Sequence, residues 1–117
     1  MKDDADELDC HDEAHPTVDH APIPADVLER AASMFRAAGD PGRLRILHCL
    51  LCGEHCVSDL AAEFDEGMST ISQRLKVLRT EGLVHRRREG KHIYYTLADD
   101  HVAELVRGAI DHAGHDH

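Results

Sequence analysis

Residues 69–97 read STISQRLKVLRTEGLVHRRREGKHIYYTL, and the order of patterns within this stretch decides the fold. Its first half places apolar residues at the i, i+4 and i+7 positions counted from Ile71, which is the spacing of a helix with one buried face. Gly82 ends that pattern, and Ser69 or Thr70 is a suitable N-terminal cap. The first half therefore predicts an amphipathic helix with a polar and basic outer face.

The second half of the stretch changes to a β pattern. Residues 83–88 and 92–97 are two β-type runs, and the three-residue connection between them contains Gly90, which predicts a hairpin. Upstream, Asp40 and Pro41 form a cap and first-turn pair that predicts the start of another helix. Together with apolar periodicity, such signals predict further helices at about 25–38, 41–53 and 56–64, and from Asp99 onward.

The order of helix, helix, short helix, turn, longer helix and basic hairpin is that of a winged helix-turn-helix domain, mainly α-helical with one β-hairpin. We expect residues 25–117 to form this single domain. Residues 1–24 are acidic, contain His and Cys, and include Pro16, Pro22 and Pro24, so we expect them to form a flexible arm.

The distribution of charge favours a nucleic-acid partner in spite of a net charge of −10. Residues 74–91 carry seven Lys or Arg and only two acids, whereas residues 1–26 carry nine acids and one Lys. A concentrated basic patch decides affinity for DNA more than the total charge does. We therefore predict that the domain binds double-stranded DNA. The alternative is a solvated helix face that happens to be basic.

The helix that begins with STIS would enter the major groove, because the short polar side chains of its first turns can reach base edges or phosphates. The hairpin would act as a wing against the DNA backbone or the minor groove. The predicted contacts of the first helical turns are Ser69, Thr70, Ser72 and Gln73, and the predicted phosphate and wing contacts are Arg74, Lys76, Arg79, Arg86, Arg87, Arg88, Lys91 and His92.

The last nineteen residues, DDHVAELVRGAIDHAGHDH, place two pairs of metal-ligating side chains at opposite ends of one predicted helix. Asp99 and His101 lie at its start, and His112 and His115 lie near its end. His101 and His112 are eleven residues apart, about 16 Å along a helix axis. Because a zinc-type ion holds its ligands at about 2.0–2.2 Å, one helix cannot bring both pairs to one ion. Two antiparallel copies could form two equivalent sites across a twofold axis. The alternative is a solvated His-rich tail.

Four stretches carry a family resemblance: GDPGRLRILHCL at 39–50, EHCVSDLA at 54–61, the stretch 69–97, and the terminal DxH…HxxH pattern. Together they resemble the ArsR/SmtB family of bacterial metal-responsive repressors. The resemblance implies a homodimer with its N- and C-terminal helices at the interface, which binds operator DNA without metal and releases it when Zn(II) binds. It also implies the ligands, in pairs from opposite subunits: Asp99, His101, His112 and His115.

The metal itself stays open at this point. Three imidazoles and one carboxylate suit tetrahedral Zn(II), and they also suit Co(II) or Ni(II). A second set resembles the thiolate site that some family members form between the arm and the short helix, and it consists of Cys10, His15, Cys56 and Asp59. That set makes Cd(II) or Pb(II) sensing an alternative, although Ser58 stands where thiophilic sensors often have a second cysteine.

Two further classes of function remain open. A thiol-based redox regulator would respond through Cys52 and Cys56, whereas Cys49 is expected in the core. A single Cys-x-x-Cys spacing does not make a structural zinc site. A zinc buffer would bind metal through the His-rich ends without binding DNA.

Composition and motifs exclude several classes. No apolar run approaches the ~20 residues of a membrane span, and the acidic N-terminus lacks the features of a signal peptide. We therefore expect a cytoplasmic protein with reduced cysteines. No nucleophile–base pair or phosphate-binding loop is present, and a metal site closed by four ligands leaves no catalytic position. We expect neither an enzyme nor a small organic substrate.

Overall fold

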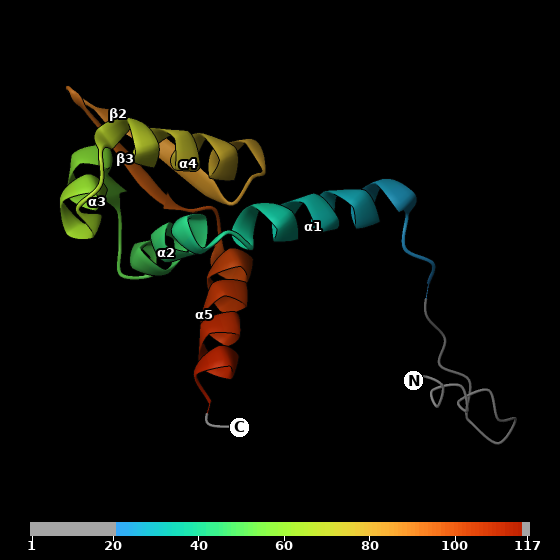
Figure 1. The fold of residues 1–117 in the computed structure, drawn as a ribbon. Helices are drawn as coiled ribbons and strands as arrows, with labels where there is room; N and C mark the ends of the chain where they lie inside the picture. The colour runs from blue at the N-terminus through green and yellow to red at the C-terminus, as the bar shows by residue number, and fades with distance from the viewer. Residues whose placement is uncertain (1–20, 116–117) are drawn as a thin grey trace, which may run out of the picture.

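The computed structural model describes residues 21–115, and its element order is that of a winged helix-turn-helix domain. Figure 1 shows α2, α3, α4 and the hairpin gathered in one body, with α1 and α5 leading away from it in different directions. The helices are α1 (Ala25–Ala38), α2 (Pro41–Leu50), α3 (Val57–Phe64), α4 (Met68–Thr80) and α5 (Asp100–Gly114). The strands are β1 (His55–Cys56), β2 (Val84–Glu89) and β3 (His92–Leu97). The predicted fold class is confirmed.

The three strands form one antiparallel sheet in the order β1-β3-β2. The hairpin register runs from Val84 opposite Leu97 to Glu89 opposite His92. The predicted three-residue connection is wrong, because Glu89 pairs with His92 and only Gly90 and Lys91 form the turn, where Gly90 adopts a positive φ of 63°. Strand β1 was not predicted. Its two residues are too short a run to show any alternation, and it exists because His55 pairs with Tyr95 on a strand far along the chain.

The start of α2 agrees with the prediction, and its end differs. Asp40 is the N-cap, since its Oδ2 accepts the backbone N–H of Arg43 at 3.0 Å, and Pro41 is the first helical residue. The helix ends at Leu50 instead of continuing to Gly53, because residues 51–53 close a series of turns in which each N–H bonds three residues back.

The predicted cap of α4 is wrong. The N-cap is Gly67 and the helix begins at Met68, so Ser69 and Thr70 lie inside the first turn with exposed side chains. No side chain caps this end. The first-turn hydroxyl groups are therefore not required to cap α4 and face solvent.

The core lies where α2, α3 and α4 meet the base of the hairpin. The apolar stripe of α4 is completely buried, with Ile71, Leu75 and Leu78 at 0% exposure, as its spacing predicts. The other fully buried large side chains are Ile46, Leu47, Leu60, Leu83 and Val84. From α5, Val102 and Val106 join this core.

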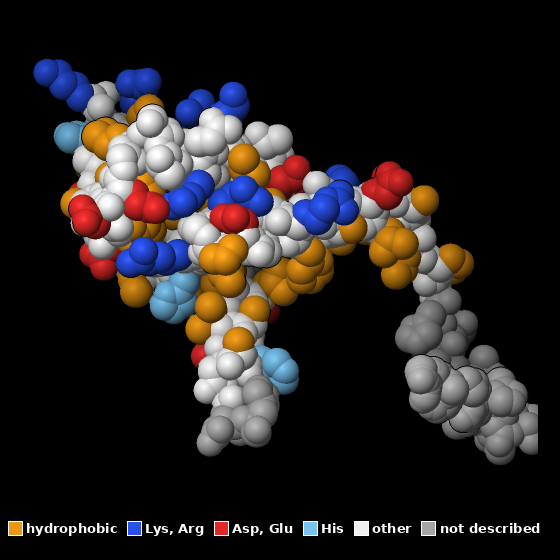
Figure 2. All heavy atoms as spheres, in the orientation of Figure 1, with side chains coloured by type: hydrophobic (Ala, Val, Ile, Leu, Met, Phe, Trp, Pro, Cys, Tyr) orange, Lys and Arg blue, Asp and Glu red, His pale blue; other side chains and the backbone are white. Residues whose placement is uncertain are grey.

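The apolar face of α1 is not part of that core. Val27, Leu28 and Phe35 are 41%, 58% and 60% exposed, and Ala37 is the one buried residue of the helix. Figure 2 shows hydrophobic side chains along one side of α1. A helix with so little burial within its own chain requires another surface against which to pack.

We expect Leu75→Ala to lower the free energy of unfolding by about 2–5 kcal/mol, because it leaves a cavity beneath α4. Urea unfolding at a fixed protomer concentration measures the change. The matched control is Lys76→Ala at the next, exposed position, for which we expect a change within about 0.5 kcal/mol. Equal stability of the two variants would show that the α4 stripe does not hold the domain together.

Candidate nucleic-acid interface and metal sites

The polar face of α4 presents its short side chains to solvent. Ser69, Thr70, Ser72 and Gln73 are all exposed, while the opposite face packs into the core. α4 rests on α2, α3 and β2, so its position relative to the hairpin is set by apolar packing. The geometry therefore leaves all four predicted first-turn contacts able to reach a ligand.

The basic side chains of α4 fall into two kinds. Lys76 is exposed, whereas Arg74 and Arg79 are half-buried. Arg74 forms an ion pair with Glu66 in the turn before α4, and its guanidinium lies against Gly42 of α2. A Cβ at Gly42 would stand 2.7 Å from Cζ of Arg74, so the arginine side chain would have to shift to admit one. Arg74 thus bonds the turn before α4 and packs against the start of α2.

Arg79 is held close to the protein body. Its Nε is buried and has no hydrogen-bond partner among residues 21–115. Because this nitrogen is enclosed by the protein, it does not face the solvent from which DNA would approach. The phosphate contact of Arg79 stays a prediction.

The hairpin carries a cluster of exposed basic side chains. Figure 2 shows Lys and Arg side chains at the tip of the hairpin and along the adjoining edge of the molecule. Arg86, Arg88, Lys91 and His92 are all exposed. These four side chains are accessible to a ligand and stay predicted DNA contacts.

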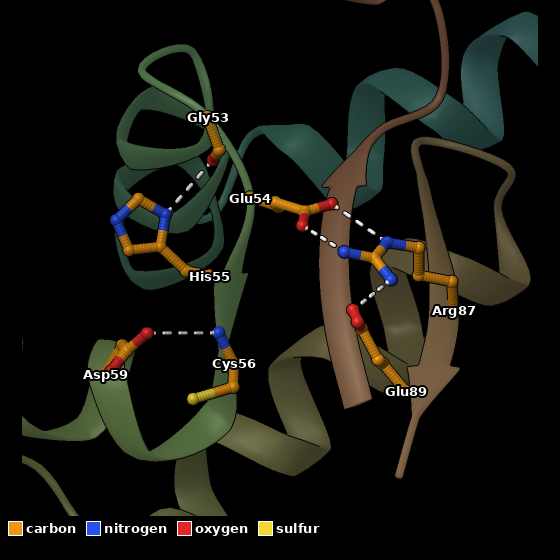
Figure 3. Close-up of polar contacts among 7 residues, drawn as sticks. All are labelled: Gly53, Glu54, His55, Cys56, Asp59, Arg87 and Glu89. Atoms are coloured by element: carbon orange, nitrogen blue, oxygen red, sulfur yellow. Dashed lines mark hydrogen bonds and ion pairs between the residues drawn. The ribbon is translucent and has the colours of Figure 1, made fainter. Parts of the chain in front are cut away.

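Arg87 differs from its neighbours because two carboxylates surround it (Figure 3). Its Nε and Nη2 donate to the two carboxylate oxygens of Glu54 at 3.1 and 2.5 Å, and its Nη1 donates to Glu89 at 2.8 Å. Its guanidinium also lies 5.0 Å from the ring centre of Tyr94. The ion pair between Arg87 and Glu54 joins the wing to the loop before β1.

The charges of this cluster stabilise one another. The hydrogen bonds from Arg87 lower the pKa of Glu54, and the hydrogen bonds to Glu54 and then Glu89 raise the pKa of Arg87 further above its ordinary value. Glu54 was not identified from the sequence, because 33 residues separate it from Arg87 and no local pattern connects them. Arg87 therefore offers DNA less uncompensated charge than Arg86 or Arg88.

The two metal-ligand pairs lie at opposite ends of α5. Asp99 is the N-cap, and its Oδ1 accepts the N–H of Val102 at 3.0 Å. Nδ1 of His101 is 4.0 Å from the same oxygen, and its side chain is 93% exposed. At the other end His112 lies in the last turn and His115 is the C-cap. Within residues 21–115 of one chain, no three His, Cys, Asp or Glu side chains come together closely enough to hold a metal ion.

The second predicted set is only partly within the described residues, since Cys10 and His15 lie outside them. Cys56 and Asp59 meet at the start of α3, where the backbone N–H of Cys56 donates to Oδ2 of Asp59 at 3.4 Å (Figure 3). Sγ of Cys56 is 3.1 Å from Oγ of Ser58. The structure thus brings two of the four predicted ligands together.

Comparison with known proteins identifies the family. Residues 40–86 match the model of the bacterial regulatory proteins of the arsR family. The chain is 44% identical over 87 residues to the transcriptional repressor SmtB homolog of Synechocystis, a match that covers 74% of this chain and 66% of that one. It is 41% identical over 97 residues to the transcriptional regulator NmtR of Mycobacterium tuberculosis, covering 83% of this chain and 81% of the relative.

The chain belongs to the ArsR/SmtB family of metal-responsive transcriptional repressors. Its structure is similar to a homodimeric winged helix-turn-helix DNA-binding domain from Mycobacterium bovis, described as a possible ArsR-family transcriptional regulator, with a TM-score of 0.75 and 31% identity over 86% of this chain and 98% of the other. As a member of this family the protein is a DNA-binding regulator, and the expectation that it is not an enzyme is confirmed.

Membrane insertion finds no support in the described part of the chain, where every helix is too short or too polar to cross a bilayer.

We expect Arg88→Ala in this ArsR/SmtB protein to weaken binding to duplex DNA of any sequence and to reduce the salt dependence of that binding by about one phosphate contact. Arg87→Ala is the matched variant on the same strand, and its effect on the salt dependence should be smaller because two carboxylates already meet its charge. Fluorescence anisotropy of labelled DNA at several salt concentrations measures both. A larger loss of salt dependence for Arg87→Ala than for Arg88→Ala would show that Arg87, and not Arg88, makes the stronger phosphate contact.

Proposed function

We propose that the protein is a zinc-responsive repressor that binds twofold-related operator DNA as a metal-free homodimer and releases it when Zn(II) binds between the α5 helices of two subunits. The observation that carries the proposal is the placement of four ligand residues at the two ends of α5. Because α5 leads away from the body of the domain, a second copy has room to lie alongside it (Figure 1).

His101 and His112, one ligand from each pair, share one face of α5. Successive residues of an α-helix turn by about 100°, so these two residues, eleven apart, point within about 20° of each other. Val102 and Val106, which pack into the core, lie on a different face. The imidazoles of His101 and His112 are therefore directed away from their own core, toward the proposed position of a partner helix.

An antiparallel pair of α5 helices that sets His101 opposite the partner's His112 also sets Leu105 opposite the partner's Gly108. Leu105 is 38% exposed, and a Cβ at Gly108 would meet nothing within 4 Å in its own chain. Glycine in a helix interior costs about 1 kcal/mol relative to alanine. The close approach of a partner's leucine gives a reason for its presence.

The remaining apolar surface fits the same dimer. A hollow of about 180 Å³ between α1, α2 and α5 is lined by apolar side chains that include Phe35, Leu44 and Leu105. It adjoins the exposed face of α1, so the partner's terminal helices would cover both surfaces together. This supports a dimer interface built from the N- and C-terminal helices.

The donor set fits a zinc-type ion. Neutral imidazole and carboxylate are ordinary zinc ligands, and four of them complete a tetrahedral site. Asp99 uses one carboxylate oxygen as the cap of α5, and a carboxylate has a second oxygen available for a metal. Co(II) and Ni(II) accept the same donors, so titrating the protein with each metal is needed to identify the ion that acts.

A short covalent path connects the proposed metal site to the DNA-binding surface. Asp99 follows β3 of the wing after one residue, Ala98, whose N–H donates to the carbonyl of Leu83 at 3.0 Å. Leu83 is buried at the junction of α4 and β2. A change in the direction of α5 on metal binding would therefore be transmitted to both DNA-contacting elements. Operator half-sites lie about 34–36 Å apart, so a small change in dimer geometry weakens binding.

A cadmium- or lead-responsive regulator is the second candidate. The observation in its favour is the meeting of Cys56 and Asp59 at the start of α3. In that case Cys10 and His15 of the same arm or the partner's arm would complete the site. Soft thiolate ligands select such ions over nickel and cobalt.

We expect His112→Ala to retain operator binding and to lose release by zinc. The matched control is His48→Ala, which removes an exposed histidine from α2. The measurement is fluorescence anisotropy of an operator that the metal-free protein selects from a random duplex library, with and without Zn(II). Parallel titrations with Ni(II), Co(II) and Cd(II) identify the effective metal.

If zinc still releases the operator from His112→Ala as it does from the wild-type protein, the α5 site is not the regulatory site. If zinc never weakens operator binding of the wild-type protein, the repressor is not a zinc sensor. By linkage the operator must weaken metal binding by the same factor, which a competition with a zinc indicator tests independently.

We expect Gly108→Leu to weaken the dimer at least tenfold, because the partner's Leu105 loses the space that glycine leaves. Arg107→Leu adds the same side chain at the neighbouring exposed position on another face of α5 and should leave the dimer intact. Sedimentation equilibrium measures both dissociation constants. Equal dissociation constants for the two variants would contradict the antiparallel arrangement.

A further inference from the structure

The C-terminal end of α2 opens onto a surface depression of about 350 Å³ that is separate from the metal ligands and the DNA-contacting residues discussed above. Cys49, Cys52 and His55 all line it, together with Glu63 from α3. Both cysteines have free thiols in the structure. The depression therefore gathers two thiols and an imidazole at one solvent-accessible place.

The backbone holds the two cysteines at a spacing that a disulfide can bridge. The N–H of Cys52 donates to the carbonyl of Cys49 at 3.2 Å, which closes a turn of four residues. Such a turn places its first and last Cα atoms within about 7 Å, and disulfides join Cα atoms about 4.4–6.8 Å apart.

Cys56 is not the partner that this geometry favours for Cys52. Its Sγ lies 3.1 Å from Oγ of Ser58, at the start of α3, and it does not line the depression. Cys49, in contrast, shares the depression with Cys52. The sequence had favoured Cys52 with Cys56 and placed Cys49 in the core, but Cys49 is only partly buried.

The two thiols differ in the way that a stepwise oxidation needs. Cys52 is exposed and can meet an oxidant. Burial, followed by the charges of Glu63 and Cys52, raises the pKa of Cys49, so that thiol keeps its proton until a base removes it. The exposed thiol is thus the first to react, and the partly buried thiol is the second.

His55 lies beside Cys49 in the same depression. Its Nδ1 is 3.0 Å from the carbonyl oxygen of Gly53 (Figure 3), and its Nε2 is 4.0 Å from Sγ of Cys49. The Cys49 thiol thus has a polar neighbour on the side that faces the depression.

We propose that Cys49 and Cys52 form a reversible redox pair that is oxidised to a disulfide by hydroperoxides. The sulfur of Cys52 attacks one peroxide oxygen, the O–O bond breaks, and Cys52 becomes a sulfenic acid while its thiol proton goes to the other oxygen, which leaves as an alcohol or as water. The sulfur of Cys49 then attacks the sulfur of Cys52, the S–O bond breaks, and the departing hydroxide takes the proton that Cys49 loses and leaves as water. Two thiols and one hydroperoxide give one disulfide, one alcohol and one water.

The test uses the full-length reduced protein, freed of metal with a chelator and treated with hydrogen peroxide. Cys10→Ser with Cys56→Ser removes the other two thiols. In that background we expect both remaining thiols to be lost together, a Cys49–Cys52 disulfide to be found by peptide mapping, and dithiothreitol to restore both thiols. Circular dichroism before treatment confirms that each variant is folded.

Variants of the two cysteines separate the steps. Cys49→Ser should leave the sulfenic acid of Cys52 trapped by dimedone, and Cys52→Ser should prevent disulfide formation. A Cys52–Cys56 disulfide in the wild-type protein, a disulfide between two chains, or two alkylatable thiols after peroxide treatment would each overturn the proposal.

Discussion

Ile71, Leu75 and Leu78 form a single stripe along α4, and all three side chains are withdrawn completely from solvent. Burying a side chain of this size contributes about 1.5–3 kcal/mol, which is large against the net stability of a small domain. The stripe presses α4 onto α2, α3 and the base of β2. Because a helix is rigid, this burial also decides which of its side chains face outward. The candidate DNA-reading face is therefore a consequence of the core rather than a separate feature.

Polar contacts refine what the core establishes. Arg74 bonds Glu66 in the turn before α4 and packs against Gly42 at the start of α2. Arg87 ties the wing to the loop before β1 through Glu54. These arginines hold elements in register, while the exposed Arg86 and Arg88 keep their charge available for phosphate. A basic stretch of sequence thus divides into side chains that position the interface and side chains that can form it.

The long terminal helices follow a different constraint. Neither α1 nor the outer face of α5 finds enough apolar surface within one chain, and the ligand pairs of α5 are too far apart to share an ion. In the proposed mechanism one partner subunit would meet both needs, and the metal would therefore act through the geometry of the dimer. The thiols at the end of α2 lie outside this arrangement, in a depression that the hairpin and the terminal helices do not use. Metal and peroxide would therefore act on separate places in the same domain.

Amino-acid pattern alone was sufficient for the α4 helix, the presence of the hairpin, the cap at Asp40 and the spacing of the α5 ligands, because each depends on neighbours within about one or two turns of chain. It was not sufficient for β1, for the pairing of Glu54 with Arg87, or for the choice of Cys49 over Cys56 as the neighbour of Cys52. Strand β1 and the Glu54–Arg87 pair join residues that only the packed chain brings together. The position of Cys52 depends on how the chain turns after α2 ends. Local periodicity determined the elements and their exposed faces. Long-range packing decided which charges are neutralised and which thiols share a depression.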